Sequence, residues 1–332
     1  MKQRSYDVVV IGGGAAGLSG ALALARARRS VLVVDSGSAR NAPAGHVHNY
    51  LGREGTPPGE LQAIGRGEVE SYGGEIVAGE VVAVERLEES DGGVGFRVLL
   101  ADDAPVTARR LLVATGLADE LPHVPGVAER WGRDVLHCPY CHGWEFRDQA
   151  IGVLATGAFA VHQALLFRQW SADVTLFLHT GPELSDDQRE QLAARGIAAV
   201  EGEVEALEIT NDQLTGVRLR SGRTVRCRAV TVMPLFMARA DLLAPLGLAA
   251  VQQQVEGHVI GSQVPADMLG ATAVAGVFVA GNVADPYAGV INAAASGLRT
   301  AAAVNGDLIA EDTRLAVAAY RTAQAGLMEA AR

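Results

Sequence analysis

The sequence predicts an α/β protein made of two Rossmann-like nucleotide-binding domains, each with a three-layer ββα architecture. In the first, Tyr6–Ile11 has the β-branched composition of a strand buried on both faces, an alanine-rich segment to about residue 27 is typical of a helix, and residues 30–34 predict a second strand. A similar strand-turn-helix-strand succession runs from Ala150 to Leu178. The chain has 332 residues, enough for two domains, and the repeat indicates a duplicated mononucleotide-binding fold.

The turn after the first strand carries the strongest ligand signal. Residues 12–17 spell G-G-G-A-A-G, which fits the G-x-G-x-x-G motif, and Asp35 follows at the end of the second strand, about twenty residues after the glycines. In this motif Gly12 permits the tight turn, Gly14 lets the backbone approach a pyrophosphate, and Gly17 lets the helix pack close to the strand. The first N–H groups of the helix would bind the phosphates, and Asp35 a ribose hydroxyl. The sequence therefore predicts a dinucleotide site here.

A Cys-Pro-Tyr-Cys sequence, Cys138 to Cys141, lies in the middle of the chain. Two thiols separated by two residues close a disulfide with little loop entropy, so such a pair exchanges electrons and adds little stability. A zinc site needs about four ligands, and Cys227, the remaining cysteine, has no partner at ligand spacing. The string also fits a c-type haem motif, because His142 follows it, but no export signal is visible at the N-terminus. Redox chemistry is the favoured interpretation.

Composition agrees with an intracellular enzyme. The 28 basic and 38 acidic residues give a net charge of -10, which argues against nucleic acid as a partner. Three cysteines are too few for a secreted disulfide scaffold. The most apolar stretch, residues 21–34, is interrupted by three arginines, so no membrane span is expected. We expect a cytoplasmic protein.

Further segments resemble a known family. Leu111–Gly116 and Gly276–Asn282 each have the pattern of a buried strand that ends in a glycine turn, and a helix is predicted from about Val290 to Asn305. Together with the first glycine motif and the cysteine pair, these segments resemble the low-molecular-weight thioredoxin reductases. The resemblance implies FAD as the cofactor and a homodimer.

The same resemblance implies a division of the chain. A discontinuous FAD-binding domain would comprise residues 1–118 and 248–332, and an inserted, degenerate NAD(P)-binding-like domain, residues 119–247, would carry the cysteine pair. Asn282 stands where the family usually has an aspartate, and it can hydrogen-bond a ribityl chain without a charge. The residues expected to contact FAD are Gly12, Gly14, Ala15, Ala16, Gly17, Asp35, Ser36, Arg40, Asn41, Asn49, Ala114, Thr115, Gly116, Gly281, Asn282, Asp285 and Val290.

The second nucleotide motif departs from the family pattern. Ala155 stands where a glycine makes the tight turn, in the order Ala155-x-Gly157-x-x-Ala160. The family's H-R-R-x-x-x-R stretch, whose arginines grip the 2'-phosphate of NADPH, is replaced by H-T-G-P-E at residues 179–183, and residues 233–237 lack an expected glycine turn. A charge-assisted hydrogen bond contributes about 1.5 to 3 kcal/mol, so losing two arginines weakens NADPH binding by about a hundredfold or more. A damaged NAD(P) site is expected, with NADH specificity as the alternative.

These departures, with His142 directly after the cysteine pair, resemble one branch of the family. This branch comprises the FAD-dependent dithiol oxidases that close disulfides in small natural products such as holomycin and gliotoxin. The resemblance implies a small-molecule dithiol as substrate and dioxygen as electron acceptor, with Cys138 facing the substrate and Cys141 the flavin. His142 would move protons near neutral pH, although a histidine there can instead cap the helix or hydrogen-bond the backbone.

Two other functions stay open from the sequence. One is a protein-disulfide reductase that acts on thioredoxin and is fed by NAD(P)H, ferredoxin or another donor; the other is a flavin-binding redox sensor without catalysis. His46 and His48 are expected to be solvated loop histidines, and Cys227 a buried, inert thiol. Four aromatic residues are candidates for an apolar substrate wall, although scattered aromatics are more often core: Tyr140, Trp144, Phe159 and Tyr287.

Overall fold

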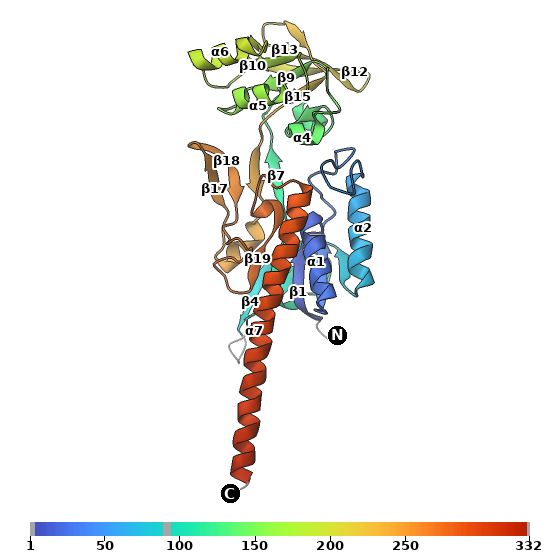
Figure 1. Ribbon diagram of the computed structural model, residues 1–332, viewed down its shortest axis with the longest axis vertical. Helices are drawn as coiled ribbons and strands as arrows, with labels where there is room; N and C mark the ends of the chain where they lie inside the picture. Colours follow the sequence, from blue (N-terminus) through green and yellow to red (C-terminus); the bar gives the residue numbers. More distant parts are fainter. Residues whose placement is uncertain (1–3, 89–93, 331–332) are drawn as a thin grey trace.

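The chain forms two α/β units, one above the other in Figure 1, which are connected by two neighbouring strands. The computed structural model describes residues 4–88 and 94–330. The lower unit contains the first glycine motif, and the upper unit contains the cysteine pair. The predicted α/β class is therefore confirmed.

The lower unit is built on a seven-stranded sheet of order β3-β2-β1-β6-β5-β4, in which β19 also pairs with β6. β1, β2, β3, β6 and β19 are parallel, whereas the β4–β5 hairpin joins β6 antiparallel. The strands are β1 (Ser5–Ile11), β2 (Val31–Asp35), β3 (Glu75–Ala78), β4 (Val81–Glu88), β5 (Val94–Leu100), β6 (Val106–Val113) and β19 (Val277–Val279), and the helices are α1 (Ala15–Arg26), α2 (Pro58–Ser71) and α7 (Val290–Ala330).

β1 is apolar on both faces because the sheet is covered on both faces. Val8 and Val10 belong to one buried cluster with residues of α1 and α7, while Val9 and Ile11 belong to a second cluster with the β4–β5 hairpin. A continuous apolar run thus serves two cores, as expected for a central parallel strand. Helices, parallel sheet and antiparallel strands form the three predicted layers.

The upper unit repeats the pattern on a smaller scale. Its five-stranded parallel sheet has the order β11-β10-β9-β15-β8, and a three-stranded antiparallel sheet, β12-β13-β14, accompanies it. The strand, helix and strand predicted between residues 150 and 178 are confirmed as β9, α5 and β10. The elements are α3 (Val127–Arg130), β8 (Val135–Leu136), α4 (Pro139–His142), β9 (Ile151–Leu154), α5 (Ala160–Phe167), β10 (Val174–Phe177), α6 (Asp186–Ala194), β11 (Ala198–Val200), β12 (Val204–Thr210), β13 (Gln213–Leu219), β14 (Thr224–Arg226) and β15 (Ala229–Thr231).

Two antiparallel strands carry the chain between the units. It enters the upper unit through β7 (Leu117–Glu120) and leaves through β16 (Leu235–Ala238), and the two strands pair with each other. β17 (Val251–Val255) and β18 (His258–Gln263) extend this pair to a four-stranded sheet. We keep residues 119–247 as the proposed inserted domain: its first limit falls within β7, whereas Ala240 and Leu243, after β16, already pack in the core of the lower unit.

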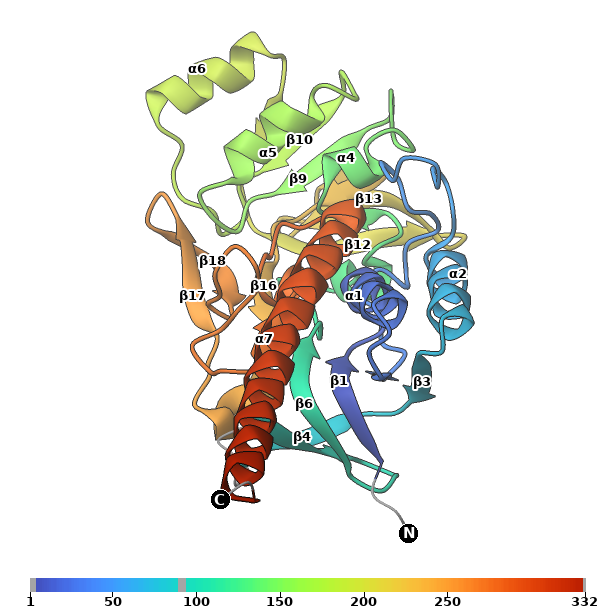
Figure 2. The ribbon, with the colours of Figure 1, turned by 60° about the horizontal axis from the view of Figure 1, so that its bottom comes forward.

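The last helix is much longer than the sequence analysis predicts. The prediction ends near Asn305, but α7 continues to Ala330, 41 residues in all, and projects beyond the lower unit (Figures 1 and 2). Gly306, which follows the predicted end, is tolerated inside the helix because the continuation is rich in alanine and has no proline. Among the described residues, no helix combines the length and apolar character needed to cross a bilayer.

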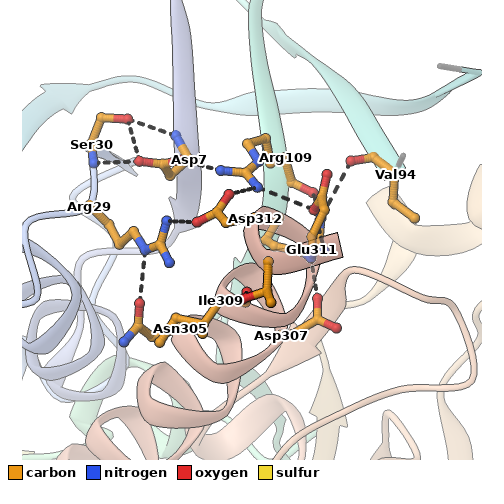
Figure 3. Close-up of polar contacts among 12 residues, drawn as sticks. Asp7, Arg29, Ser30, Val94, Arg109, Asn305, Asp307, Ile309, Glu311 and Asp312 are labelled. Carbon is orange, nitrogen blue, oxygen red and sulfur yellow. Dashed lines mark hydrogen bonds and ion pairs between the residues drawn. The ribbon is translucent and has the colours of Figure 1, made fainter. Parts of the chain in front are cut away.

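Ion pairs fix α7 to the sheet before it leaves the body. Arg109 of β6 donates to Asp7 of β1 at 2.9 Å and to Asp312 of α7 at 2.5 Å (Figure 3). Arg29 also reaches Asp312, at 2.8 Å. Arg110, only 4% exposed, binds Glu311 at 2.6 Å. Residues 316–328 of the same helix are all exposed, so this network marks the last anchored turn.

Acid should loosen this anchor through Asp7. Burial raises the pKa of Asp7, but hydrogen bonds from Ser30 and Arg109 outweigh it, and the pKa lies below its usual value. A lowered folded-state pKa gives stability that is present above the unfolded pKa and lost as the pH falls through the folded one. The melting temperature should therefore decrease when the pH is lowered below about 4. Asp7→Asn should make this decrease shallower, whereas the exposed Asp102→Asn should leave it unchanged. The same dependence of the melting temperature on pH in Asp7→Asn and wild type would contradict the role of Asp7.

Candidate active site

One cleft joins the glycine motif to the cysteine pair. It has a volume of about 1810 Å³, and its walls include Gly12 and Gly14 of the lower unit and Cys138 and Cys141 of the upper unit. Pockets for small molecules usually measure about 300–1,000 Å³. The cleft therefore has room for a dinucleotide and for a small substrate beside it.

The glycine turn has the close packing that its motif predicts. Gly12 has a φ of 106°, and a Cβ there would lie 2.4 Å from the carbonyl oxygen of Ala114. A Cβ at Gly17 would lie 1.9 Å from the carbonyl oxygen of Gly12, so only glycine lets α1 approach β1 this closely. Gly17 itself does not line the cleft; its role is this helix–strand contact.

The start of α1 fits the pyrophosphate of FAD. The first turn carries no acidic residue, and no side chain caps the helix. A Cβ built on Gly14 meets no atom within 4 Å, so the backbone borders open space in the cleft. Uncapped N–H groups at a helix start bind anions. The chain's own geometry therefore suits a dinucleotide phosphate at this place.

Most residues predicted to contact FAD line this cleft. The exceptions are Gly17 and Asp285, and Asp285 instead accepts a hydrogen bond from the Tyr287 N–H at 3.1 Å. The amide of Asn282 donates to the carbonyl oxygens of Asp285 and Ala288, at 3.0 and 2.9 Å, and so holds the same turn. The predicted residues that do line the cleft are Gly12, Gly14, Ala15, Ala16, Asp35, Ser36, Arg40, Asn41, Asn49, Ala114, Thr115, Gly116, Gly281, Asn282 and Val290.

Two of these side chains have ion-pair partners that sequence analysis missed. Asp35, the predicted ribose acceptor, accepts a hydrogen bond from Arg66 of α2, whose Nε is buried and has no partner in the described ranges 4–88 and 94–330. Arg40 donates to Asp119 of β7 at 2.8 and 2.6 Å. Neither partner belongs to a motif, and only the folded chain brings them to the cleft.

The cysteines form the predicted redox pair. Cys138 and Cys141 are joined by a disulfide with their Cα atoms 5.2 Å apart, and both line the cleft. Cys138 is the N-cap of the short helix α4, and Pro139 occupies the first helical position, as its missing N–H favours. Cys227 is buried, and burial raises the pKa of its thiol to about 12, so it stays protonated and unreactive as predicted.

His142 lies beside the disulfide without a structural task for its ring. Both ring nitrogens are buried and have no hydrogen-bond partner among the described residues, so the alternative role in capping is wrong. Burial lowers the pKa of His142, against the opposing charge of Glu145. The imidazole is therefore neutral near pH 7 and able to accept a proton. His137, on the other side of the pair, is also buried, which lowers its pKa to about 4.

Three of the four candidate aromatics border the cleft: Tyr140, Phe159 and Tyr287. Tyr140 is 65% exposed and meets Trp170 edge to face. Trp144 is 64% exposed but lies outside the lining, with the guanidinium of Arg147 stacked 4.2 Å from its ring centre. The alternative that these side chains belong to the core is wrong for Tyr140 and Trp144.

In the second nucleotide motif, Ala155 packs against a neighbouring turn of the chain. Ala155 is 3% exposed, and a Cβ at Gly181 would lie 2.7 Å from the Ala155 Cβ, so the two backbones pack against each other. His179 accepts a hydrogen bond from the Val204 N–H at 3.0 Å. A positive charge near His179 comes from Arg220, which is paired with Glu203. The basic clamp expected of an NADPH site is not formed by these residues.

Comparison with known proteins gives the family. The model of the pyridine nucleotide-disulphide oxidoreductases matches residues 6–301. Thioredoxin reductase sirT of Leptosphaeria maculans is 30% identical over 325 residues, which cover 92% of this chain and 95% of that protein. The crystal structure of HlmI is 48% identical with a TM-score of 0.87, over 96% of this chain and 97% of that one. An oxidoreductase from Agrobacterium tumefaciens is 35% identical with a TM-score of 0.83, over 92% and 99%.

These matches confirm the resemblance to thioredoxin reductases and the two-domain Rossmann-like fold class. They extend over both units, so the glycine turn and the cysteine pair fall within one matched protein. The disulfide in the cleft wall supplies the matching chemistry. The chain belongs to the pyridine nucleotide-disulphide oxidoreductases, as a thioredoxin reductase-like thiol/disulfide oxidoreductase.

Proposed function

We propose that this chain is an FAD-dependent dithiol oxidase. It would form a disulfide in a small-molecule dithiol and pass the electrons through the Cys138–Cys141 bridge to FAD and then to dioxygen. The observation that carries the proposal is the place of the bridge, in the wall of the same cleft as the dinucleotide-binding turn. The closed second nucleotide motif favours electrons from a dithiol over electrons from NADPH. We further propose a cytoplasmic homodimer.

The thiol chemistry follows from the two cysteines. A substrate thiolate attacks the Cys138 Sγ, the Cys138–Cys141 bond breaks, and Cys141 leaves as a thiolate. The second substrate thiolate attacks the substrate sulfur of the mixed disulfide, which closes the substrate disulfide and releases Cys138. The enzyme has then gained the electron pair that the substrate lost. FAD, when bound, supplies the two-electron acceptor that restores the bridge.

His142 can accept the protons that the substrate thiols release. Each substrate thiol must lose its proton before it attacks, because the thiolate is the nucleophile. His142 lines the same cleft as the pair, and within the described part of the chain neither nitrogen of its neutral ring has a hydrogen-bond partner, so the ring can accept a proton. Apolar contact with Tyr140 and Tyr287 would hold a small dithiol next to it.

Reduction of a protein disulfide remains the second candidate. The curated relative sirT bears the name thioredoxin reductase, which keeps this reaction in view. A reductase needs an electron donor such as NADPH. In the inserted domain Arg220 is already paired with Glu203, and the buried Ala155 fills the turn where a glycine is expected. We therefore favour the oxidase direction.

Oxygen uptake distinguishes the two directions. The FAD-loaded protein, given dithiothreitol in air, should consume oxygen and release hydrogen peroxide, with one disulfide formed per oxygen molecule. A monothiol such as 2-mercaptoethanol, which cannot close an internal disulfide, should be oxidised far more slowly. No oxygen uptake with dithiothreitol, but rapid reduction of an oxidised thioredoxin by NADPH, would favour the reductase.

Removing the His142 ring should slow turnover without disturbing the fold. His142→Ala should lower kcat by roughly 10²- to 10⁴-fold, the usual contribution of general acid-base catalysis. The disulfide and the bound flavin should be retained, because neither ring nitrogen holds the structure. The exposed His123→Ala, outside the cleft lining, is the matched control. A kcat for His142→Ala equal to that of the control would remove His142 from the mechanism.

A further inference from the structure

A loop of the lower unit reaches across to the redox segment of the upper unit. This loop, residues 47–56, is closed at its base by the Val47 N–H, which donates to the Thr56 carbonyl at 2.8 Å. The amide of Asn49 donates to the carbonyl oxygen of Tyr140, between the two cysteines, at 2.7 Å. His48 Nε2 lies 3.5 Å from the carboxylate of Glu145. Two neighbouring residues of the loop, His48 and Asn49, thus contact residues 138–145, which we call the redox segment.

One carboxylate sets both of these residues in place. Glu54 accepts a hydrogen bond from the Asn49 N–H at 2.8 Å, and its other oxygen lies 2.6 Å from His48 Nδ1. Asn49 has a φ of 58°, in the left-handed region that asparagine tolerates better than most residues. Glu54 thus holds Asn49 in a strained backbone conformation while the Asn49 side chain binds the redox segment. This combination indicates that the fold maintains the contact for a function.

The contact between the units requires a particular charge state of His48. Its two ring nitrogens face two carboxylates, Glu54 and Glu145. A neutral imidazole has one N–H and can donate to only one of them; the imidazolium can donate to both.

We propose that the 47–56 loop is a clasp that positions the Cys138–Cys141 disulfide in the cleft, and that His48 fastens it only as the imidazolium. The imidazolium donates to both Glu54 and Glu145. The neutral ring, which has one N–H, keeps the shorter contact to Glu54 and loses the link to Glu145. His48 and Glu145 are thus positioning residues. Their effect on turnover rests on the proposed function, but the clasp itself does not.

Hydrogen exchange tests the clasp without turnover. The amides of Cys141 and His142 donate to the Cys138 carbonyl within the segment, so their exchange reports on how firmly it is held. The Glu145→Gln protein, loaded with FAD, should exchange the amides of a peptide covering residues 138–147 roughly fivefold faster than wild type, the effect of losing an exposed ion pair.

Two variants complete the test. His48→Gln can still donate to Glu54 but carries no charge, so it should behave as Glu145→Gln does. Asp148→Asn removes a carboxylate from the same stretch that makes no ion pair among the described residues, and should match wild type. Equal exchange of Glu145→Gln and wild type would overturn the clasp. Wild-type exchange in His48→Gln would overturn the role of the imidazolium. Failure of the wild-type protein to oxidise dithiothreitol would contradict the proposed function but not the clasp.

Discussion

Cys138→Ser and Cys141→Ser will each abolish dithiol oxidation, with turnover reduced to background. A lone thiol can form a mixed disulfide, but it cannot accept an electron pair into an internal bridge and pass it on. The structure gives the bridge no substitute, because Cys227 is buried and its thiol stays protonated. Oxygen uptake with dithiothreitol measures the loss directly.

The two variants should also differ from each other. If Cys141 is the flavin-facing sulfur, Cys138→Ser leaves its thiolate next to oxidised FAD and should show a long-wavelength absorption that Cys141→Ser lacks. Cys227→Ala is the control and should keep full activity, since the thiol lies outside the cleft. Full activity in Cys138→Ser would overturn the proposed mechanism, and the band in Cys141→Ser alone would exchange the two roles.

Gly14→Val will yield a folded protein that does not retain flavin. The backbone of Gly14 is extended, with φ −76° and ψ −175°, which valine adopts readily. A Cβ at this position meets no protein atom within 4 Å, so the added methyl groups enter the cleft where the pyrophosphate is expected. The purified variant should be colourless, with a far-ultraviolet circular dichroism spectrum like that of wild type.

A neighbouring glycine separates cofactor loss from misfolding. Gly17→Val should fail to fold, since its Cβ would lie 1.9 Å from the Gly12 carbonyl oxygen. Gly67→Ala, at an open position on α2, should remain yellow and stable. A yellow Gly14→Val protein with flavin in a one-to-one ratio would remove this turn from the cofactor site.

Local patterns in the sequence were enough to predict the parts of the site that depend on neighbouring residues. The glycine spacing predicts the close packing at Gly17 because the clash that excludes other residues there is with the carbonyl oxygen of Gly12, in the same motif. The Cys-x-x-Cys spacing predicts the disulfide for the same reason. The resemblance to a family added the distant segments at Ala114 and Gly281, which pack against the first motif and line the same cleft.

Contacts between distant segments had no such signal. His48 was expected to be a solvated loop histidine, yet its ring lies between Glu54 and Glu145, and Glu145 is in the other unit. The length of α7 was underestimated: the prediction ends near Asn305, whereas the helix continues to Ala330. Arg66 and Asp119 carry no motif, and only the tertiary fold brings them to Asp35 and Arg40.

The most direct test of the central claim is anaerobic reduction of the FAD-loaded protein, followed by absorbance of the flavin. Dithiothreitol should bleach the flavin rapidly through the Cys138–Cys141 bridge, and admitted air should restore the colour. NADPH at the same concentration should bleach it at least about a hundredfold more slowly, because no arginine is free to bind the 2'-phosphate at residues 179–183. Rapid, stoichiometric bleaching by NADPH, with none by dithiothreitol, would contradict the oxidase.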